Sequence, residues 1–257
     1  MSLHDDWLRA QTALATPFFD AIRPSLMALG GHAWPGIDQL NALVATHTHV
    51  RFVPADAATK SAMQYETHIA TTSEIPTRQN WHDLFNALQW LNFPLMKTAI
   101  SRQHAALLAR GGELEAKARS VPRDVLTMFD ESGIIVVSKD ETLLQLIRDF
   151  QWQTLFVDHR HEVETNMRFT LVGHGLMEKS LAPFIGITAK AMLLNIDIDD
   201  DLDQHAAHWL NDEINLQSAR NLSPLPLLGI PGWDARNFDA AFYRNTQYFR
   251  AGYTRDR

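Results

Sequence analysis

The sequence predicts an α+β fold, in which one helix-rich domain spans residues 1–257 and includes short strands and at least one β-hairpin. Apolar residues recur at helical spacing over several long segments, as in amphipathic helices. Short β-branched runs lie between these segments without a regular strand–helix–strand rhythm, so a doubly wound parallel sheet is not expected. The 257 residues are 46% hydrophobic and 21% charged, which is typical of a globular protein.

The N-terminal part, residues 6–45, is predicted to be helical. A long helix over 6–29 follows from apolar residues at a spacing near 3.6, and Gly30 with Gly31 ends it. A second, short helix is predicted over 37–45.

The central part, residues 50–220, begins with short strands predicted at 50–53 and 65–70 and a turn at 75–78. The clearest helix follows at 81–91, where apolar residues line one face and Asn80 occupies the N-cap position.

The next helix begins at Pro94 and is predicted to end near residue 109, before a pair of glycines. Residues 125–129 and 134–138 are predicted to form a β-hairpin, with Gly133 at a position that can take positive φ. Asp130 and Glu131 are interpreted as solvent-facing residues of its turn. The remaining elements are a helix after Asp140 to 150, a strand at 167–172, a helix at 174–181, a strand at 191–196 and a helix at 203–220. Residues 221–257, rich in proline, glycine and aromatic residues, are predicted to wrap the surface.

Composition excludes several classes of site. The chain has no cysteine, so disulfides, iron–sulfur clusters and thiol nucleophiles are impossible, and a metal site must use histidine, carboxylate or amide ligands. A net charge of −7 argues against nucleic-acid binding. No apolar run reaches the roughly 18 residues of a spanning helix, and the acidic N-terminus lacks signal-peptide features, so a cytoplasmic protein is expected. Common phosphate-binding and serine-hydrolase motifs are absent.

His82 and Asn86 form the first candidate site. They lie four residues apart on the clearest helix and face away from its apolar side, so they suit a general base with an orienting amide, or part of a metal site. The alternative is structural: His82 stabilises the helix start, and Asp83 serves as the third residue of a capped helix.

His174 and Glu178 form the second candidate. On a helix they share one face, as two metal ligands do, and Gly173 and Gly175 would permit close approach of backbone or ligand. The alternative is a histidine that hydrogen-bonds at a helix start beside a surface glutamate. His104, on the helix after Pro94, is placed to meet His82 across a helical hairpin.

Four long motifs together resemble one protein family. The stretch from Pro76 to Pro94, with Pro-Thr-Arg-Gln-Asn-Trp-His-Asp-Leu-Phe-Asn-Ala-Leu at its start, closely resembles the signature of a bacterial family known as domain of unknown function 3025. Stretches 126–133, 173–184 and 225–233 match in the same order, so the resemblance spans roughly residues 50–250. It implies a bacterial origin but no activity, cofactor or catalytic residue. The motifs contain more polar residues than packing requires: Arg78, Asn80, His82, Asp83, Asn86, Asp130, His174 and Glu178.

Whether the chain is an enzyme stays open, and the working hypothesis is a cytoplasmic metal-dependent hydrolase. A divalent ion would activate water, and Arg78 would bind a small anionic or phosphoester substrate. The metal-ligand candidates are His82, His104, His174 and Glu178, with Asp83 as a further one; the catalytic candidates are Arg78, His82, Asp83 and Asn86. One alternative is a non-catalytic protein that binds a small molecule or a protein through its aromatic C-terminal segment. Another is a metal-free acid–base enzyme centred on His82 and Asn86.

Overall fold

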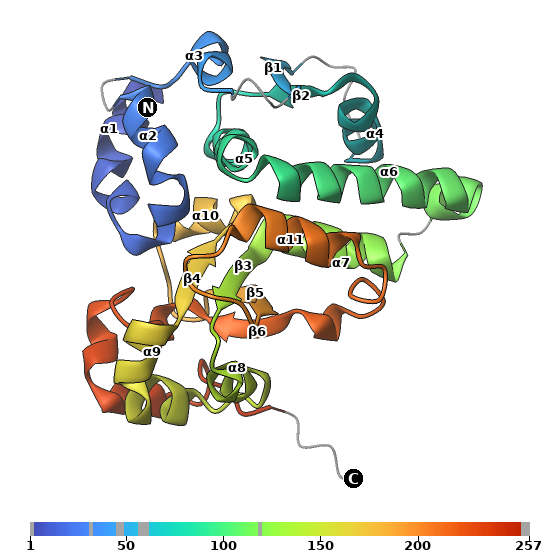
Figure 1. Ribbon diagram of the computed structural model, residues 1–257. Helices are drawn as coiled ribbons and strands as arrows, with labels where there is room; N and C mark the ends of the chain where they lie inside the picture. Colours follow the sequence, from blue (N-terminus) through green and yellow to red (C-terminus); the bar gives the residue numbers. More distant parts are fainter. Residues whose placement is uncertain (1–2, 31–32, 45–48, 56–61, 118–119, 253–257) are drawn as a thin grey trace.

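The α+β class is confirmed by the computed structural model, which describes residues 3–30, 33–44, 49–55, 62–117 and 120–252 (Figure 1). Its strands form a two-stranded and a four-stranded sheet within these ranges. The small sheet pairs β1 (Arg51–Pro54) with β2 (Glu74–Thr77) in parallel. No helix in the described part of the chain is long and apolar enough to cross a membrane.

The four-stranded sheet lies at the centre of the molecule and has the order β4-β3-β5-β6. Central β3 pairs in parallel with β5 and antiparallel with β4, while β5 pairs antiparallel with β6. All five residues of β3 are buried, as expected for a strand covered on both faces. The strands are β3 (Gly133–Val137), β4 (Arg168–Leu171), β5 (Thr188–Leu194) and β6 (Ser223–Pro226).

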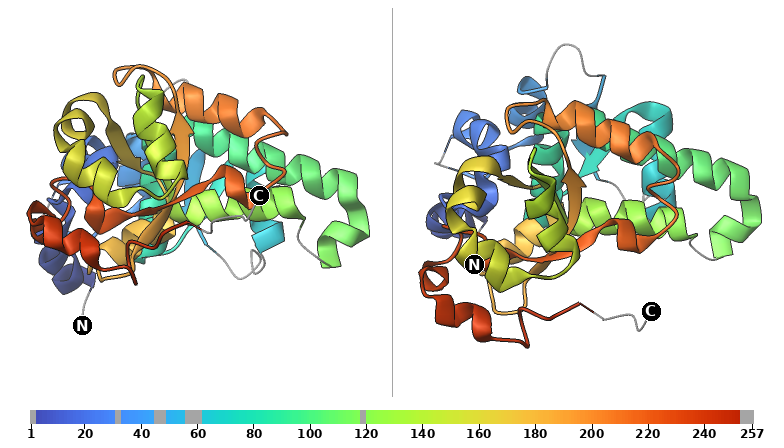
Figure 2. Two further views of the ribbon diagram at one scale, coloured as in Figure 1. Left: turned by 90° about the horizontal axis from the view of Figure 1, so that it is seen from below. Right: turned by 60° about the horizontal axis from the view of Figure 1, so that its bottom comes forward.

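Alternate residues of β3 enter two separate hydrophobic clusters. Ile135 and Val137 pack with residues of α6 (Pro94–Lys117), α7 (Val121–Ser132) and α11 (Leu202–Asn211). Ile134 and Val136 face the other cluster. The side-chain period of two in a strand explains this division. In Figures 1 and 2, α6 runs along α11 and α7, and its far end extends beyond the sheet.

The second cluster contains the N-terminal helices, several central helices and the C-terminal segment. The longest of its central helices is α5, where Leu84, Phe85 and Leu88 are buried. Besides α6, α7 and α11, the α-helices in the described ranges are α1 (Leu3–Leu14), α2 (Arg23–Leu29), α3 (Ile37–Ala42), α4 (Ala62–Thr72), α5 (Trp81–Asn92), α8 (Glu141–Arg148), α9 (Arg160–Asn166) and α10 (His174–Ser180).

The β-hairpin expected around residues 130–133 is wrong. Residues 121–132 form α7, in which buried Val125, Leu126 and Phe129 follow the helical spacing and Pro122 lies in the first turn. Gly133 ends this helix with a φ of −73° rather than a positive value. Strand β3 then pairs with β4 and β5, both of which come later in the chain.

Other boundaries also differ from expectation. The predicted strand at 65–70 lies inside α4, and the predicted turn at 75–78 overlaps β2. The long N-terminal helix is interrupted near Pro17, which begins a 3-10 turn because proline cannot continue the preceding helix. Helix α6 continues through the glycine pair to Lys117, and α11 ends at Asn211 rather than near residue 220.

The aromatic C-terminal segment is divided between the core and the surface. Tyr243, Tyr248 and Phe249 are buried and cannot belong to a docking surface, whereas Phe238 is exposed. The Tyr243 hydroxyl donates to the Gly229 carbonyl, and the Tyr248 hydroxyl donates to the Ile187 carbonyl. These bonds let buried tyrosines satisfy their polar ends. The segment lies beside α8 and α9 (Figure 1).

Candidate metal centre

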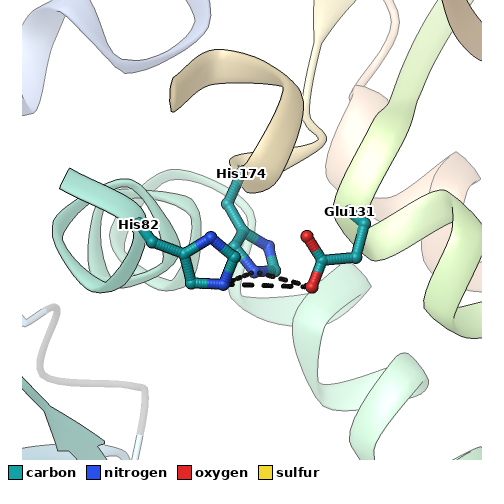
Figure 3. A group of neighbouring side chains, drawn as sticks. All are labelled: His82, Glu131 and His174. Carbon is teal, nitrogen blue, oxygen red and sulfur yellow. Dashed lines mark hydrogen bonds and ion pairs between the residues drawn. The ribbon is translucent and has the colours of Figure 1, made fainter. Parts of the chain in front are cut away.

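Three elements that are far apart in the sequence bring His82, Glu131 and His174 together. His82 lies in the first turn of α5, Glu131 in the last turn of α7, and His174 is the first residue of α10. Figure 3 shows the two imidazoles and the carboxylate pointing toward one another. Among the described residues, this is the group whose ligand atoms lie close enough to hold one metal ion.

Local contacts explain why these elements meet. The Asn80 side chain accepts a hydrogen bond from the Asp83 backbone N–H and so fixes the start of α5, as predicted. The Gly133 carbonyl accepts from the backbone N–H groups of Val172 and Gly173, which brings the start of α10 to the end of α7. A Cβ on Gly173 would clash with the Gly133 backbone, so only glycine permits this approach.

The three inward atoms form a nearly equilateral triangle. His82 Nε2 lies 3.2 Å from His174 Nε2, and Glu131 Oε1 lies 3.9 Å from the first and 3.6 Å from the second. A point equidistant from all three therefore lies about 2.1 Å from each, within the range of zinc–nitrogen and zinc–carboxylate bonds. The triangle fits a first-row divalent ion.

Gly175 leaves the space that the Glu131 carboxylate occupies. A Cβ at this residue would occupy the place of the Glu131 carboxylate. The expectation that Gly173 and Gly175 permit a close approach is confirmed for both residues.

The outer nitrogen of each imidazole faces a further carboxylate. His82 Nδ1 lies 3.3 Å from Glu178 Oε2, and His174 Nδ1 lies 3.8 Å from Asp130 Oδ2. At 3.8 Å, Asp130 makes no hydrogen bond to His174 Nδ1. The Glu178 carboxylate does reach His82 Nδ1, and it favours the His82 tautomer with its proton on Nδ1, which leaves the Nε2 lone pair directed at the common point. Metal-binding histidines in proteins commonly have this arrangement.

Burial controls the charges at the centre. It lowers the pKa of His174 to about 4 against the opposing effect of Asp130, so this imidazole is neutral at pH 7. Burial raises the pKa of Glu131, although His82 partly opposes this. For Asp130 burial alone would raise the pKa, but the neighbouring Lys97 reverses the direction and holds the pKa below its ordinary value.

The centre is open on one side. The His174 side chain is only 6% exposed, whereas those of His82 and Glu131 are 36% and 43% exposed. Water and a substrate therefore have access to the common point.

The other predicted site residues lie around these three. Asp83 accepts from the Arg78 backbone N–H and guanidinium at 2.8 to 2.9 Å, so the two residues brace the turn before α5. Asn86 donates to the Tyr65 hydroxyl at 2.7 Å. His104 is buried on α6 and contributes no atom to the group of three, and Glu178 faces His82 from the outer side.

Glu131 is the member of the converging group that the sequence interpretation missed. The assumed hairpin placed it at a turn, where carboxylates usually face solvent. The signal that identifies it is the helical spacing of Val125, Leu126 and Phe129, which places Glu131 in the last turn of a helix.

A family model described as a protein of unknown function (DUF3025) matches residues 50–253, a range that contains all three inward-facing residues. No curated protein and no solved structure is similar enough to count as a match.

Proposed function

The chain belongs to the DUF3025 family, and because the description of that family names no activity, we propose from the site itself that the protein is a divalent-metal-dependent hydrolase. The observation that carries the proposal is the convergence of His82 Nε2, His174 Nε2 and Glu131 Oε1 on one point at metal-ligand distance.

The electrostatics of the centre support a bound cation. With protons on both Nδ1 atoms, the two Nε2 atoms and the carboxylate oxygen all direct lone pairs at the same point. These three acceptor atoms repel one another electrostatically when no donor lies between them. A divalent ion bound at the common point would replace that repulsion with attraction. The metal-free alternative is a proton shared between His82 and His174 across their 3.2 Å separation.

Three protein ligands leave room for a water molecule on the ion. An ion held in this way lowers the pKa of bound water to about 7 and so supplies a nucleophile at neutral pH. Two histidines and a carboxylate also bind iron(II) in non-haem oxygenases. The exposure of His82 and Glu131 favours hydrolysis, because oxygenase chemistry needs water excluded from reactive intermediates.

The proposed substrate is a small anionic or phosphoester compound. Arg78 was expected to bind its anionic group, but the Arg78 guanidinium is paired with Asp83. Lys97 is likewise paired with Asp130. We therefore propose that the positive charge that would attract a substrate oxygen is that of the bound ion.

Elemental analysis of the purified, untagged protein, with no added metal and no chelator, tests the proposal. We expect about one transition-metal ion per chain, lost in His82→Ala, Glu131→Ala and His174→Ala variants that remain folded by circular dichroism. His161→Ala is the matched control, because His161 is exposed on α9 and is not one of the three converging residues. Loaded protein is then screened against phosphoesters and carboxylic esters.

A metal-free preparation calls for a second step. Chelated protein is titrated with zinc, manganese and iron(II) while its melting temperature is followed. If none of these ions raises the melting temperature, the metal centre and the hydrolase proposal are both wrong. Specific retention of iron(II) with no hydrolysis of any ester would instead favour an oxygenase.

A further inference from the structure

We infer that the buried Lys97–Asp130 pair positions His174 for metal binding. This inference rests on the proposed metal centre and assigns to it two residues that would not bind the ion directly.

The last turn of α7 contacts both nitrogens of one imidazole. Asp130 Oδ2 lies 3.8 Å from His174 Nδ1, and the next residue, Glu131, places Oε1 3.6 Å from His174 Nε2. Adjacent carboxylates on one helix thus face opposite edges of the same ring. A rotation of the ring would separate both pairs of atoms.

Lys97 fixes the other oxygen of Asp130. Its Nζ lies 2.5 Å from Asp130 Oδ1, and the Lys97 side chain is only 4% exposed. A series of side-chain contacts, from Lys97 on α6 through Asp130 on α7 to His174, therefore connects α6 with the proposed metal centre. The buried ammonium hydrogen-bonds Oδ1 and so holds the carboxylate with its other oxygen, Oδ2, facing His174 Nδ1.

Stability alone does not account for this pair. Removing two charges from water is costly, and a buried ion pair is often no more stabilising than apolar side chains of similar volume. The Lys97–Asp130 pair does, however, place a carboxylate 3.8 Å from His174 Nδ1 in a water-poor environment, where its electrostatic attraction for the edge of the ring that carries Nδ1 is little screened. Apolar side chains there would remove that attraction.

The carboxylate that faces His82 lies in a different environment. The Glu178 side chain is 46% exposed, so solvent and salt screen its interaction with His82. We therefore expect Asp130 to affect metal affinity more than Glu178 does.

The decisive variants replace both members of the pair at once, because removing Asp130 alone would leave the buried Lys97 ammonium without the carboxylate to which it donates. Lys97→Met with Asp130→Leu removes the polar group that faces His174 Nδ1, while Lys97→Met with Asp130→Asn retains an uncharged polar group there. Cobalt(II) affinity is measured by competition, together with the visible absorption of the bound cobalt.

We expect the Met/Leu double variant to bind cobalt 10- to 100-fold more weakly than the unaltered protein, with an altered absorption spectrum. The Met/Asn double variant should recover part of the affinity, and Glu178→Gln should lose less than the Met/Leu variant. If the Lys97–Asp130 pair had only a structural role, the two double variants would bind cobalt with the same affinity. If both bind cobalt as tightly as the unaltered protein, the positioning role is wrong while the metal centre stands.

A second measurement needs no variant. In zinc-loaded protein labelled with ¹⁵N, His174 should show a metal-bound Nε2 and a protonated Nδ1 whose proton is shifted downfield. An unprotonated Nδ1 overturns the inference. Failure of the unaltered protein to bind either cobalt or zinc overturns the proposed function first, so the two failures are distinguishable.

Discussion

Gly175 shows how a single hydrogen atom in place of a methyl group determines a candidate ligand position. A Cβ there would lie 2.2 Å from Glu131 Oε2, at the end of a side chain that can move, and 3.2 Å from the Glu131 backbone carbonyl oxygen, which is a tight contact. Alanine is favoured over glycine in a helix by up to about 1 kcal/mol, which offsets the cost of that contact. Gly175→Ala is therefore expected to change the melting temperature of the metal-free protein little while weakening metal binding by at least about tenfold.

Calorimetric titration of Gly175→Ala with zinc, alongside thermal unfolding without metal, measures both effects. Gly36→Ala is the matched control, because the nearest atom to a Cβ at Gly36 is 3.9 Å away. Unchanged zinc affinity in Gly175→Ala would show that Glu131 binds no ion or can bind from another position.

At the scale of single residues, the sequence pattern indicated His82 and His174 but not Glu131, the residue that converges with them. His82 and His174 stood out because each is a polar residue near the start of a helix within a long motif. The residues four positions later, Asn86 and Glu178, are on the expected faces but do not join the three converging atoms. Helical spacing indicates which side chains share a face, whereas the third atom of this site comes from another helix.

At the scale of elements, the first turn of α5 has to hold His82 in place. The Asn80 cap bonds the backbone of Asp83, the residue directly after His82. Asn80→Ala is expected to lower the free energy of unfolding by about 1 kcal/mol. Because the loosened turn carries a proposed ligand, it should also weaken metal binding several-fold, as measured by chemical denaturation and by zinc titration.

Asp201→Ala separates the two effects of a lost cap. The Asp201 side chain caps α11 by accepting from the backbone N–H groups of Asp203 and Gln204, and α11 carries none of the three proposed ligands. A similar loss of stability with unchanged zinc affinity is expected for this control. Equal loss of affinity in both variants would show that general destabilisation, and not the position of His82, weakens binding.

The elements themselves were predictable where local signals agreed. Helix α5 has an apolar face and an N-cap residue, and α8 has Asp140 as its cap, and both form as expected. Helix α7 was missed because the apolar run at residues 125–129 is too short to distinguish helical spacing from the alternation of a strand, and because Gly133 suggested a turn. Gly133 does not form a turn but allows close packing, because a Cβ at this position would clash with Phe129. That requirement is set by tertiary contacts, which a local pattern does not contain.

At the scale of the whole molecule, the composition and the mixed periods predicted the α+β class correctly. The burial of individual residues in the C-terminal segment was not predictable, because buried and exposed aromatic residues give the segment the same composition. Tyr243 and Tyr248 are buried because their hydroxyls reach backbone carbonyls of Gly229 and Ile187. Such partners become identifiable only once the chain is folded.

Protonation of the buried His174 links the centre to the stability of the whole fold. Its pKa is about 4 in the folded protein because burial disfavours the charged form, against an ordinary value of 6.5. The unfolded chain therefore binds more protons between these two pH values, so the free energy of unfolding falls as the pH is lowered through this window. Asp130 opposes this effect of burial on the pKa, whereas the nearby Lys97 and His82 add to it.

For metal-free protein, we expect His174 to account for about 2 kcal/mol of the stability lost between pH 7.5 and pH 5. Urea denaturation of chelated protein at both pH values measures the total loss, and His174→Asn, which does not titrate, should lose about that much less. The same pH dependence in both proteins would mean that burial does not lower the pKa of His174. A smaller loss in the unaltered protein than in His174→Asn would mean that His174 gains a proton in the fold, and the case for a cation between the two imidazoles would then fail.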